Sequence, residues 1–317
     1  MKNEREAAMA FERVKTFHPS SKFAPIALLK AAEYYGRLKD TDNTLRVLRT
    51  LTQEYTTDEV LPARNKLAEI LISAGQFEQA RQESKRVIDA TKESQLKARA
   101  LVLYGQSLIG LGKITEAETA ISEVTTNFKS TSSYYDALFA LGVLKNAAGK
   151  TDEALAAWKS AADDSLKAPK QLRQDAYMEM AEANNRMQSN AQALELFEKA
   201  GKIRGLRNGE ALYKAGVAAE RTGDRVKAAQ LYSRALTDSV GNADSRAIIV
   251  GAMKGAVTIK NFTEAVRLTN LFRQQYPSDA NLPRLLIEGA TVAIDEVGDT
   301  KTAIEFCEWL LEHFPAS

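Results

Sequence analysis

The strongest constraint on the fold of this chain is an internal repeat with a period of 35 to 39 residues. One position, usually alanine, recurs at this spacing, and we call its nine copies the anchors: Ala7, Thr44, Ala80, Ala117, Ala154, Ala193, Ala228, Ala265 and Ala303. In most copies a large residue follows four positions later, as Ile121, Trp158 and Tyr232 do. Residues four apart lie on one face of a helix, so each anchor is predicted to lie in a helix. A period of this length predicts stacked supersecondary units that share a continuous core.

Each predicted unit consists of two short helices. The position five residues before the anchor is the predicted turn between them, and it carries Gly75, Gly112, Gly149, Gly223 and Gly298, with Lys39, Gln188 and Lys260 as exceptions. Glycine there favours a left-handed backbone, which ends the first helix. Twelve residues before the anchor the side chain is usually small, as at Gly105 and Gly216, which predicts close packing against the anchor. Neither helix is long enough to be stable alone, so the units must stack.

The unit around Ala154 resembles a known family, position by position. Leu141-Gly142, Gly149, Glu153-Ala154, Trp158 and Ala161 resemble the tetratricopeptide repeat pattern, and the likeness covers nearly the whole chain. The resemblance implies an all-α fold, a right-handed α-α superhelix of about eight helix-pair repeats after an N-terminal half repeat. We expect a single array over 1–317, with the half repeat at 4–19 and repeats at approximately 24–56, 60–93, 97–131, 134–167, 173–206, 208–240, 245–278 and 283–315. Because the chain begins inside a second helix, we expect it to be a fragment of a longer protein.

Several repeats end in an aromatic residue followed by proline or a polar cluster. Examples are Phe17-His18-Pro19-Ser20-Ser21, Phe128-Lys129-Ser130-Thr131-Ser132-Ser133 and Tyr276-Pro277-Ser278-Asp279. This ending resembles the repeats of bacterial envelope proteins, namely outer-membrane assembly lipoproteins and Tol-Pal-associated periplasmic factors. The resemblance favours a location in the bacterial periplasm or at the outer membrane, with the cytoplasm as the alternative.

Composition excludes several classes of function. The chain has 43 Lys and Arg against 41 Asp and Glu, a net charge of +2, which argues against a nucleic-acid partner. No apolar run approaches a membrane span. The lone cysteine, Cys307, excludes an internal disulfide, and because it occupies the position equivalent to Trp158 we expect it to be buried. The two histidines, His18 and His313, lie in distant repeats, so no metal site is expected.

No motif predicts catalysis. Gly149-Lys150-Thr151 has the ending of a phosphate-binding loop, but that motif requires a preceding strand and a glycine where this chain has Leu144. Serine and threonine residues occur outside any nucleophile motif, and no catalytic constellation converges. The sequence therefore predicts neither an enzyme nor a cofactor.

The family resemblance also implies where a partner would bind. In tetratricopeptide arrays the first helices line a concave groove through positions 18, 15, 14 and 11 before the anchor, which we call the groove positions. The candidate partner-binding residues are Lys30, Glu33, Asn65, Lys66, Glu69, Arg99, Gln106, Asp136, Phe139, Asp175, Glu179, Glu182, Glu210, Tyr213, Lys214, Lys254 and Glu288. The early repeats contribute cations, whereas those from Asp136 to Glu210 are acidic. They do not reproduce the family's clamp for a C-terminal carboxylate.

Two functions follow from the resemblance, and one plainer interpretation stands beside them. The first is a non-enzymatic scaffold that binds a peptide or protein partner in the groove, in bacterial envelope assembly. The second is a regulatory or sensor module that controls a catalytic domain outside this sequence. The plainer interpretation is that the groove positions are merely solvated, since charge placement alone specifies no ligand. The partner and the oligomeric state are not predicted.

Overall fold

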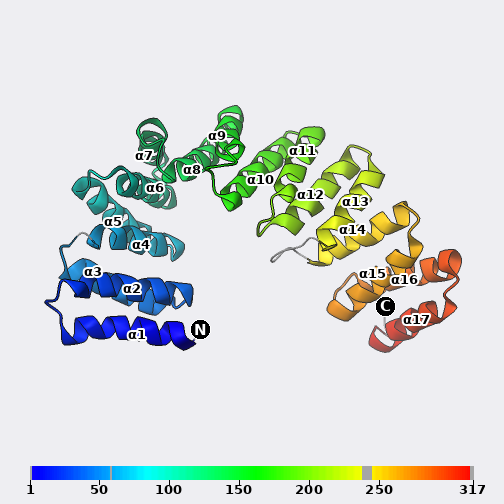
Figure 1. Ribbon diagram of the computed structural model, residues 1–317. Coiled ribbons are helices and arrows are strands. Elements are labelled where there is room, and N and C mark those ends of the chain that lie inside the picture. Colours follow the sequence, from blue (N-terminus) through cyan, green and yellow to red (C-terminus); the bar gives the residue numbers. More distant parts are fainter. Residues whose placement is uncertain (1, 58, 238–244, 315–317) are drawn as a thin grey trace. The chain divides into compact units, whose positions relative to one another are not determined.

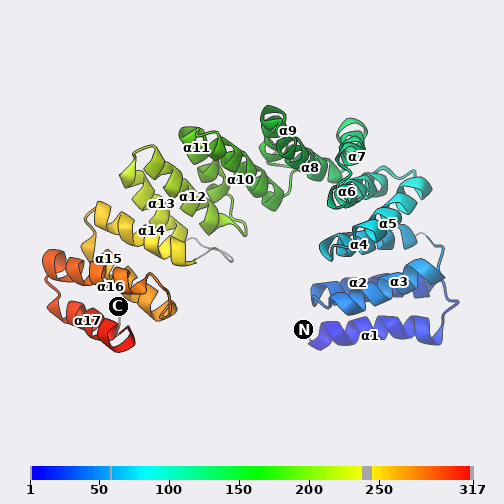
Figure 2. The ribbon, with the colours of Figure 1, turned by 180° about the vertical axis from the view of Figure 1, so that it is seen from behind.

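The computed structural model describes residues 2–57, 59–237 and 245–314, and over these ranges the chain is helical without strands (Figures 1 and 2). The helices are α1 (Lys2–Phe17), α2 (Phe23–Arg37), α3 (Thr41–Glu54), α4 (Val60–Ser73), α5 (Phe77–Ala90), α6 (Ser94–Gly110), α7 (Ile114–Asn127), α8 (Ser133–Ala147), α9 (Thr151–Asp163), α10 (Lys170–Arg186), α11 (Asn190–Lys202), α12 (Asn208–Arg221), α13 (Arg225–Thr237), α14 (Ser245–Thr258), α15 (Phe262–Gln275), α16 (Leu282–Val292), the π-helical turn η1 (Ala293–Val297) and α17 (Thr300–His313). None of the described helices has both the length and the apolar character needed to cross a membrane.

The helices follow one another as a lone α1 and eight pairs, from α2–α3 to α16–α17, and consecutive helices pack on one another from α1 to α8 and from α10 to α17. The all-α solenoid prediction is confirmed. The chain divides into two compact units, Met1–Ala157 and Trp158–Ser317, which we call the N-terminal and C-terminal units. In the C-terminal unit one apolar cluster continues from Met178 in α10 to Phe306 in α17. The predicted single array is not tested by this division.

The turns inside the pairs follow the sequence pattern closely. All eight predicted turn residues have positive φ, between 57° and 86°. Glycine adopts this backbone without strain, but Lys39, Gln188 and Lys260 do so with a Cβ atom present. The same turn therefore forms in every pair, at a small conformational cost in three of them.

The anchors are buried in the eight pairs, with exposed fractions of at most 4%. The glycines before the turn lie against the large residue of the paired helix, and Gly105 also lies against its anchor, since a Cβ atom there would be 3.5 Å from the carbonyl oxygen of Ala117. A Cβ atom on Gly105 would lie 2.5 Å from Cγ1 of Ile121, and one on Gly216 would lie 2.4 Å from Cε1 of Tyr232. The absent Cβ thus makes room for the bulky side chain of the paired helix.

At both ends of the described chain, the buried positions differ by one residue from those that the repeat pattern predicts. In α1 the fully buried residue is Ala8, next to the predicted anchor. In the last pair, η1 is wound more widely than an α-helix, and the buried small residue is Ala290 rather than Thr291. The register of the groove positions in α16 therefore shifts by one residue.

The prediction that Cys307 is buried is wrong, because its side chain is exposed. Its neighbour Phe306, three residues after the anchor Ala303, takes the buried place with an exposed fraction of 1%. In the described structure α17 packs on α16 and η1, and no later helix covers its other side. In the earlier pairs, the residue four positions after the anchor is buried between its own pair and the pair that follows. Cys307 has no such following pair in the described structure.

Candidate functional site

The predicted groove residues lie on the first helices of the pairs, as expected, but their surroundings differ. Lys30, Glu33, Lys66, Lys254 and Glu288 are exposed, and most of the others are half-buried. Asn65 is 5% exposed. Its Nδ2 donates to the carbonyl of Leu96, in the first turn of α6, at 3.2 Å, so this residue links α4 to α6 and is not on the groove surface.

In the N-terminal unit the groove charges pair with one another. The guanidinium of Arg99 on α6 donates to Glu69 on α4 at 2.7 Å and to Asp136 on α8 at 3.0 Å. Lys66 donates to the same Glu69 at 2.8 Å, and Lys30 donates to Glu33 at 2.8 Å. Burial raises the pKa of Asp136. The charges on these first helices therefore act as links between repeats.

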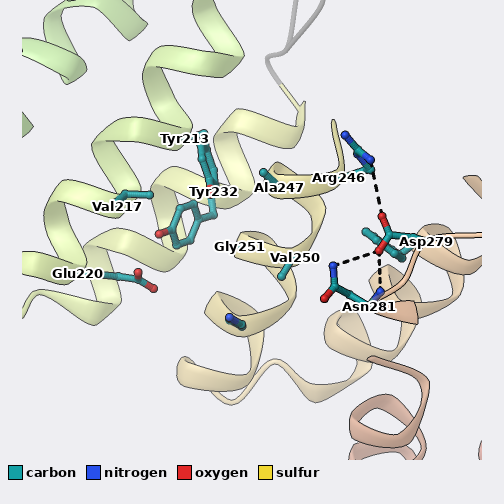
Figure 3. A pocket seen from close by; sticks show the side chains of 12 residues that line it. Tyr213, Val217, Glu220, Tyr232, Arg246, Ala247, Val250, Gly251, Asp279 and Asn281 are labelled. Atoms are coloured by element: carbon teal, nitrogen blue, oxygen red, sulfur yellow. Dashed lines mark hydrogen bonds and ion pairs between the residues drawn. The ribbon is translucent and has the colours of Figure 1, made fainter. Parts of the chain in front are cut away.

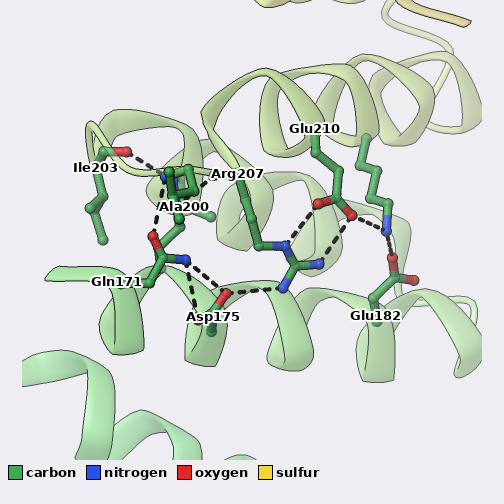
Figure 4. A network of polar contacts seen from close by, with 10 residues as sticks. Gln171, Asp175, Glu182, Ala200, Ile203, Arg207 and Glu210 are labelled. Carbon is green, nitrogen blue, oxygen red and sulfur yellow. Dashed lines mark hydrogen bonds and ion pairs between the residues drawn. The ribbon is translucent and has the colours of Figure 1, made fainter. Parts of the chain in front are cut away.

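A second network fills the groove face between α10 and α12 (Figure 4). Arg207, the residue before α12, donates to both oxygens of Glu210 at 2.8 and 3.0 Å and to Asp175 at 3.1 Å. Lys214 joins Glu210 at 3.0 Å and also bonds Glu182. The hydrogen bonds from Arg207 lower the pKa of Glu210 to about 2. The predicted acidic surface is thus largely neutralised within the protein.

The loop that carries Arg207 is held by two glutamines of α10. Gln174 is fully buried, and its Nε2 donates to the carbonyls of Ala200 at 3.1 Å and Ile203 at 2.9 Å. Its Oε1 accepts from the backbone N–H of Arg207 at 3.1 Å. The Oε1 of Gln171 accepts from the preceding backbone N–H of the loop, that of Leu206, at 3.1 Å. Hydrogen bonds between the two glutamines and the loop backbone therefore hold Arg207 where its side chain can pair with Asp175 and Glu210.

Of the five cations predicted at groove positions, four pair with groove carboxylates. Lys254 on α14 is the fifth, and it makes no ion pair with any residue that the structure describes. Glu179 on α10 is likewise without an ion-pair partner among the described residues. The face around Lys254 consequently differs from the two networks.

A cavity of about 390 Å³ opens on that face (Figure 3). It lies over α12, α14 and the start of α16, and side chains of α13 and α15 form part of its floor. The lining residues that belong to groove positions are Tyr213 and Val217 from α12, and Ala247, Val250, Gly251 and Lys254 from α14. Two consecutive first helices thus contribute six groove positions to one hollow.

The hollow exists because α14 carries short side chains where other first helices carry long ones. Position 18 before the anchor is Arg99, Asp136, Asp175 or Glu210 in the preceding four repeats, and it is Ala247 here. Position 14 before the anchor, a lysine in several repeats, is Gly251. A Cβ atom on Gly251 would stand 3.0 Å from the ring of Tyr232, so this ring is the floor that the glycine leaves open.

Charges stand at opposite sides of the hollow with apolar surface between them. Figure 3 shows Tyr232 and Glu220 on one side and Arg246 and Asp279 on the other. Burial, and then the charge of Glu220, raise the pKa of Tyr232, so its hydroxyl stays protonated. Asp279 is fixed by the backbone N–H of Asn281 at 2.9 Å and faces Arg246 at 3.8 Å. Such a site can hold a ligand with apolar and charged groups, and its lining includes no paired nucleophile and base.

Sequence reasoning identified Tyr213 and Lys254 but missed the rest of this hollow. Polar side chains at groove positions predict a binding surface, and this criterion does not include the apolar groove positions Ala247, Val250 and Gly251. The sequence does contain a signal for this hollow. Two groove positions that carry charged residues in several other repeats are occupied here by Ala247 and Gly251.

Comparison with known proteins agrees with this architecture. Residues 1–140 match the model of a tetratricopeptide repeat-like domain, and residues 186–244 match that of a tetratricopeptide repeat. These matches, with the stacked helix pairs, show that the chain is a tetratricopeptide repeat protein. No curated protein matches the sequence.

Three solved structures illustrate the likeness in fold. A Pyrococcus horikoshii signal transduction ATPase with a tetratricopeptide repeat sensor gives a TM-score of 0.57 at 14% identity, over 97% of this chain and 54% of that one. The apo quorum sensor NprR from B. thuringiensis gives 0.55 at 11%, over 98% and 94%. PilF of Pseudomonas aeruginosa gives 0.52 at 16%, over 73% and 98%. At these identities the likeness shows the fold alone.

Proposed function

We propose that this protein is a non-enzymatic scaffold that binds a segment of a protein partner on the groove face of its C-terminal unit. The observation that carries the proposal is the coincidence of the 390 Å³ hollow with the groove positions of α12 and α14. Most of the charges at the other groove positions are paired within the protein, with Glu179 as an exception, which leaves little for a ligand to gain there. A hollow with an aromatic floor and a charged rim is the kind of surface on which a few side chains supply most of the binding energy.

The bacterial envelope is the setting that we propose for this partner. The support is the aromatic, proline and polar ending of several repeats, in particular Tyr276-Pro277-Ser278-Asp279, which places Asp279 and Asn281 at the rim of the hollow.

A sensor module is the second candidate. A hollow of 390 Å³ is also within the size range of small-molecule sites. Two of the proteins with a similar fold are the ATPase with a tetratricopeptide repeat sensor and the quorum sensor NprR. In that case a ligand in the hollow would change the stability of α12–α15 and so signal to another domain.

Selection from a random peptide library displayed on phage tests the scaffold proposal. The baits are the wild-type chain, Ala247→Trp, which fills the hollow, and Ala191→Trp, which adds the same side chain to an exposed position of α11 as a matched control. We expect recurrent peptide sequences that bind the wild type and Ala191→Trp but not Ala247→Trp. Circular dichroism confirms that all three baits are folded. Recurrent peptides that bind Ala247→Trp as well as the wild type, or a selection without enrichment, would contradict the proposal.

A further inference from the structure

We propose that the partner segment is an extended peptide carrying two apolar side chains about three residues apart, with an acidic side chain between them that pairs with Lys254. This inference rests on the proposed function and specifies its ligand.

The first support is a second hollow on the other side of α14. It has a volume of about 50 Å³ and lies between α14 and α16. Its lining is mostly apolar, with Met253, Val257, Leu285 and Val292 among the contributing residues. This hollow accepts a small apolar side chain, whereas the hollow of about 390 Å³ accepts an aromatic one.

Both hollows share Val250 and Lys254, which therefore form the ridge between them. A ligand that enters both hollows must cross this ridge. Packed helices lie about 10 Å apart. An extended chain in the polyproline II conformation advances about 3.1 Å per residue and returns to the same face every three residues, so the two apolar side chains are separated by about three residues. The residues between them pass over α14.

The second support is the charge of the ridge. The other four predicted groove cations are each paired with a carboxylate on a neighbouring position, whereas Lys254 has no such partner among the described residues. A lysine on the ridge between the two hollows is complementary to a carboxylate on the ligand. The nearest groove carboxylate on the following helix, Glu288, is engaged by Arg284 at 2.8 Å.

The test uses blocked octapeptides with tyrosine and valine three residues apart, in both orders, and either glutamate or glutamine between them. Their affinities for the full chain are measured by fluorescence anisotropy. We expect the glutamate peptide of one order to bind at least about threefold more tightly than its glutamine counterpart, the difference expected for one partly exposed ion pair. Replacing the tyrosine or the valine by glycine weakens binding further.

A charge exchange separates a direct contact from a general effect. We expect Lys254→Glu to bind the glutamate peptide about tenfold or more weakly than the wild type does. A peptide with lysine in place of glutamate is expected to restore binding to this variant. Lys159→Glu, an equal change on an exposed position of α9, is the matched control and leaves both affinities unchanged.

The outcomes distinguish this inference from the proposed function. If peptides recovered from the random library fail to bind Ala247→Trp, whose tryptophan fills the hollow, but bind Lys254→Glu as tightly as they bind the wild type, the scaffold proposal stands and the present inference is wrong. The same octapeptides with an unblocked C-terminus are measured in parallel. If only these unblocked peptides bind, the acid is terminal rather than internal, and the inference is again wrong. Restoration in the charge exchange establishes it.

Discussion

Helix α12 presents two different faces to its neighbours in the C-terminal unit. Towards α10, the groove positions Asp175, Glu182, Glu210 and Lys214 are joined through Arg207 into one network of ion pairs (Figure 4). Towards α14, the equivalent positions leave a hollow of about 390 Å³. We call the first region the closed face and the second the open face.

The difference teaches that charge at a groove position is not by itself a sign of ligand binding. Where consecutive first helices carry opposite charges, the side chains satisfy one another and stabilise the stack. Where a repeat carries Ala247 and Gly251 instead, none of the described residues forms an ion pair with Lys254, and the surface stays open. The functional signal is a local departure from the repeat, in the direction of smaller side chains.

The largest expected difference between the faces is in stability. Arg207→Met leaves Asp175 and Glu210 without their shared cation, and we expect the free energy of unfolding to fall by about 2–3 kcal/mol. Lys254→Met removes no ion pair within the part of the chain that the structure describes, and it is expected to change the free energy of unfolding by less than about 0.5 kcal/mol. Urea unfolding followed by circular dichroism gives both values. Equal losses would contradict the distinction between closed and open faces.

The second-largest expected effect is a loss of stability of the closed face at low pH. The pKa of Glu210 is held at about 2 against an ordinary value of 4.5, so its contribution is complete above pH 4.5 and is lost as the pH falls towards 2. We expect this loss to be about 1–2 kcal/mol after allowance for solvent screening. Glu210→Gln removes that part of the pH dependence, which urea unfolding at several pH values between 3 and 6 can follow. A variant with the wild-type acid profile would show that Glu210 is not the responsible group.

Two glycines on opposite sides of Tyr232 sharpen the comparison. Gly216→Ala places a Cβ atom 2.4 Å from the ring and should destabilise the protein by about 1 kcal/mol. Gly251→Ala meets the same ring at 3.0 Å on the open side, where the ring can shift, and alanine favours the helix, so we expect little net change. Thermal unfolding of the two variants shows whether the ring of Tyr232 can shift on the open side.

The smallest expected effect concerns the turn that ends α14. Lys260 has φ of 60°, a conformation that costs a residue with a Cβ atom more than it costs glycine. Lys260→Gly is expected to stabilise the protein by about 0.5 kcal/mol, because relief of this cost is partly offset by the greater freedom of glycine in the unfolded chain. Gly223→Ala, at the equivalent turn after α12, should destabilise it instead. The two changes are compared by urea unfolding.

Much of the fold could be predicted from the sequence because the repeat is a local pattern. The positive φ of Gly149 and of Lys260 follows from a single turn position read in register, and the burial of the anchors follows from helical spacing. Cys307 was misplaced because its burial depends on a neighbouring helix that this position in the described structure lacks. Register also shifted at η1, which no sequence signal that we used indicates.

The site could be predicted only in part. Tyr213 and Lys254 were identified from their register, and both line the hollow. Arg207 was not, because it lies in a loop before α12 and reaches the groove through side-chain length and the hydrogen bonds of Gln174. Pairing between charges on different repeats depends on three-dimensional proximity, which periodicity alone does not supply.

The most direct test of the account is a crystal structure of the full chain with a peptide recovered by selection on the wild-type protein. We predict electron density for an extended peptide across α12, α14 and α16, with one side chain in the hollow above Tyr232 and the charge network of Arg207 unchanged. Density for the peptide over the network between α10 and α12, or on the outer face formed by the second helices, would contradict the central claim that the open face is the binding site.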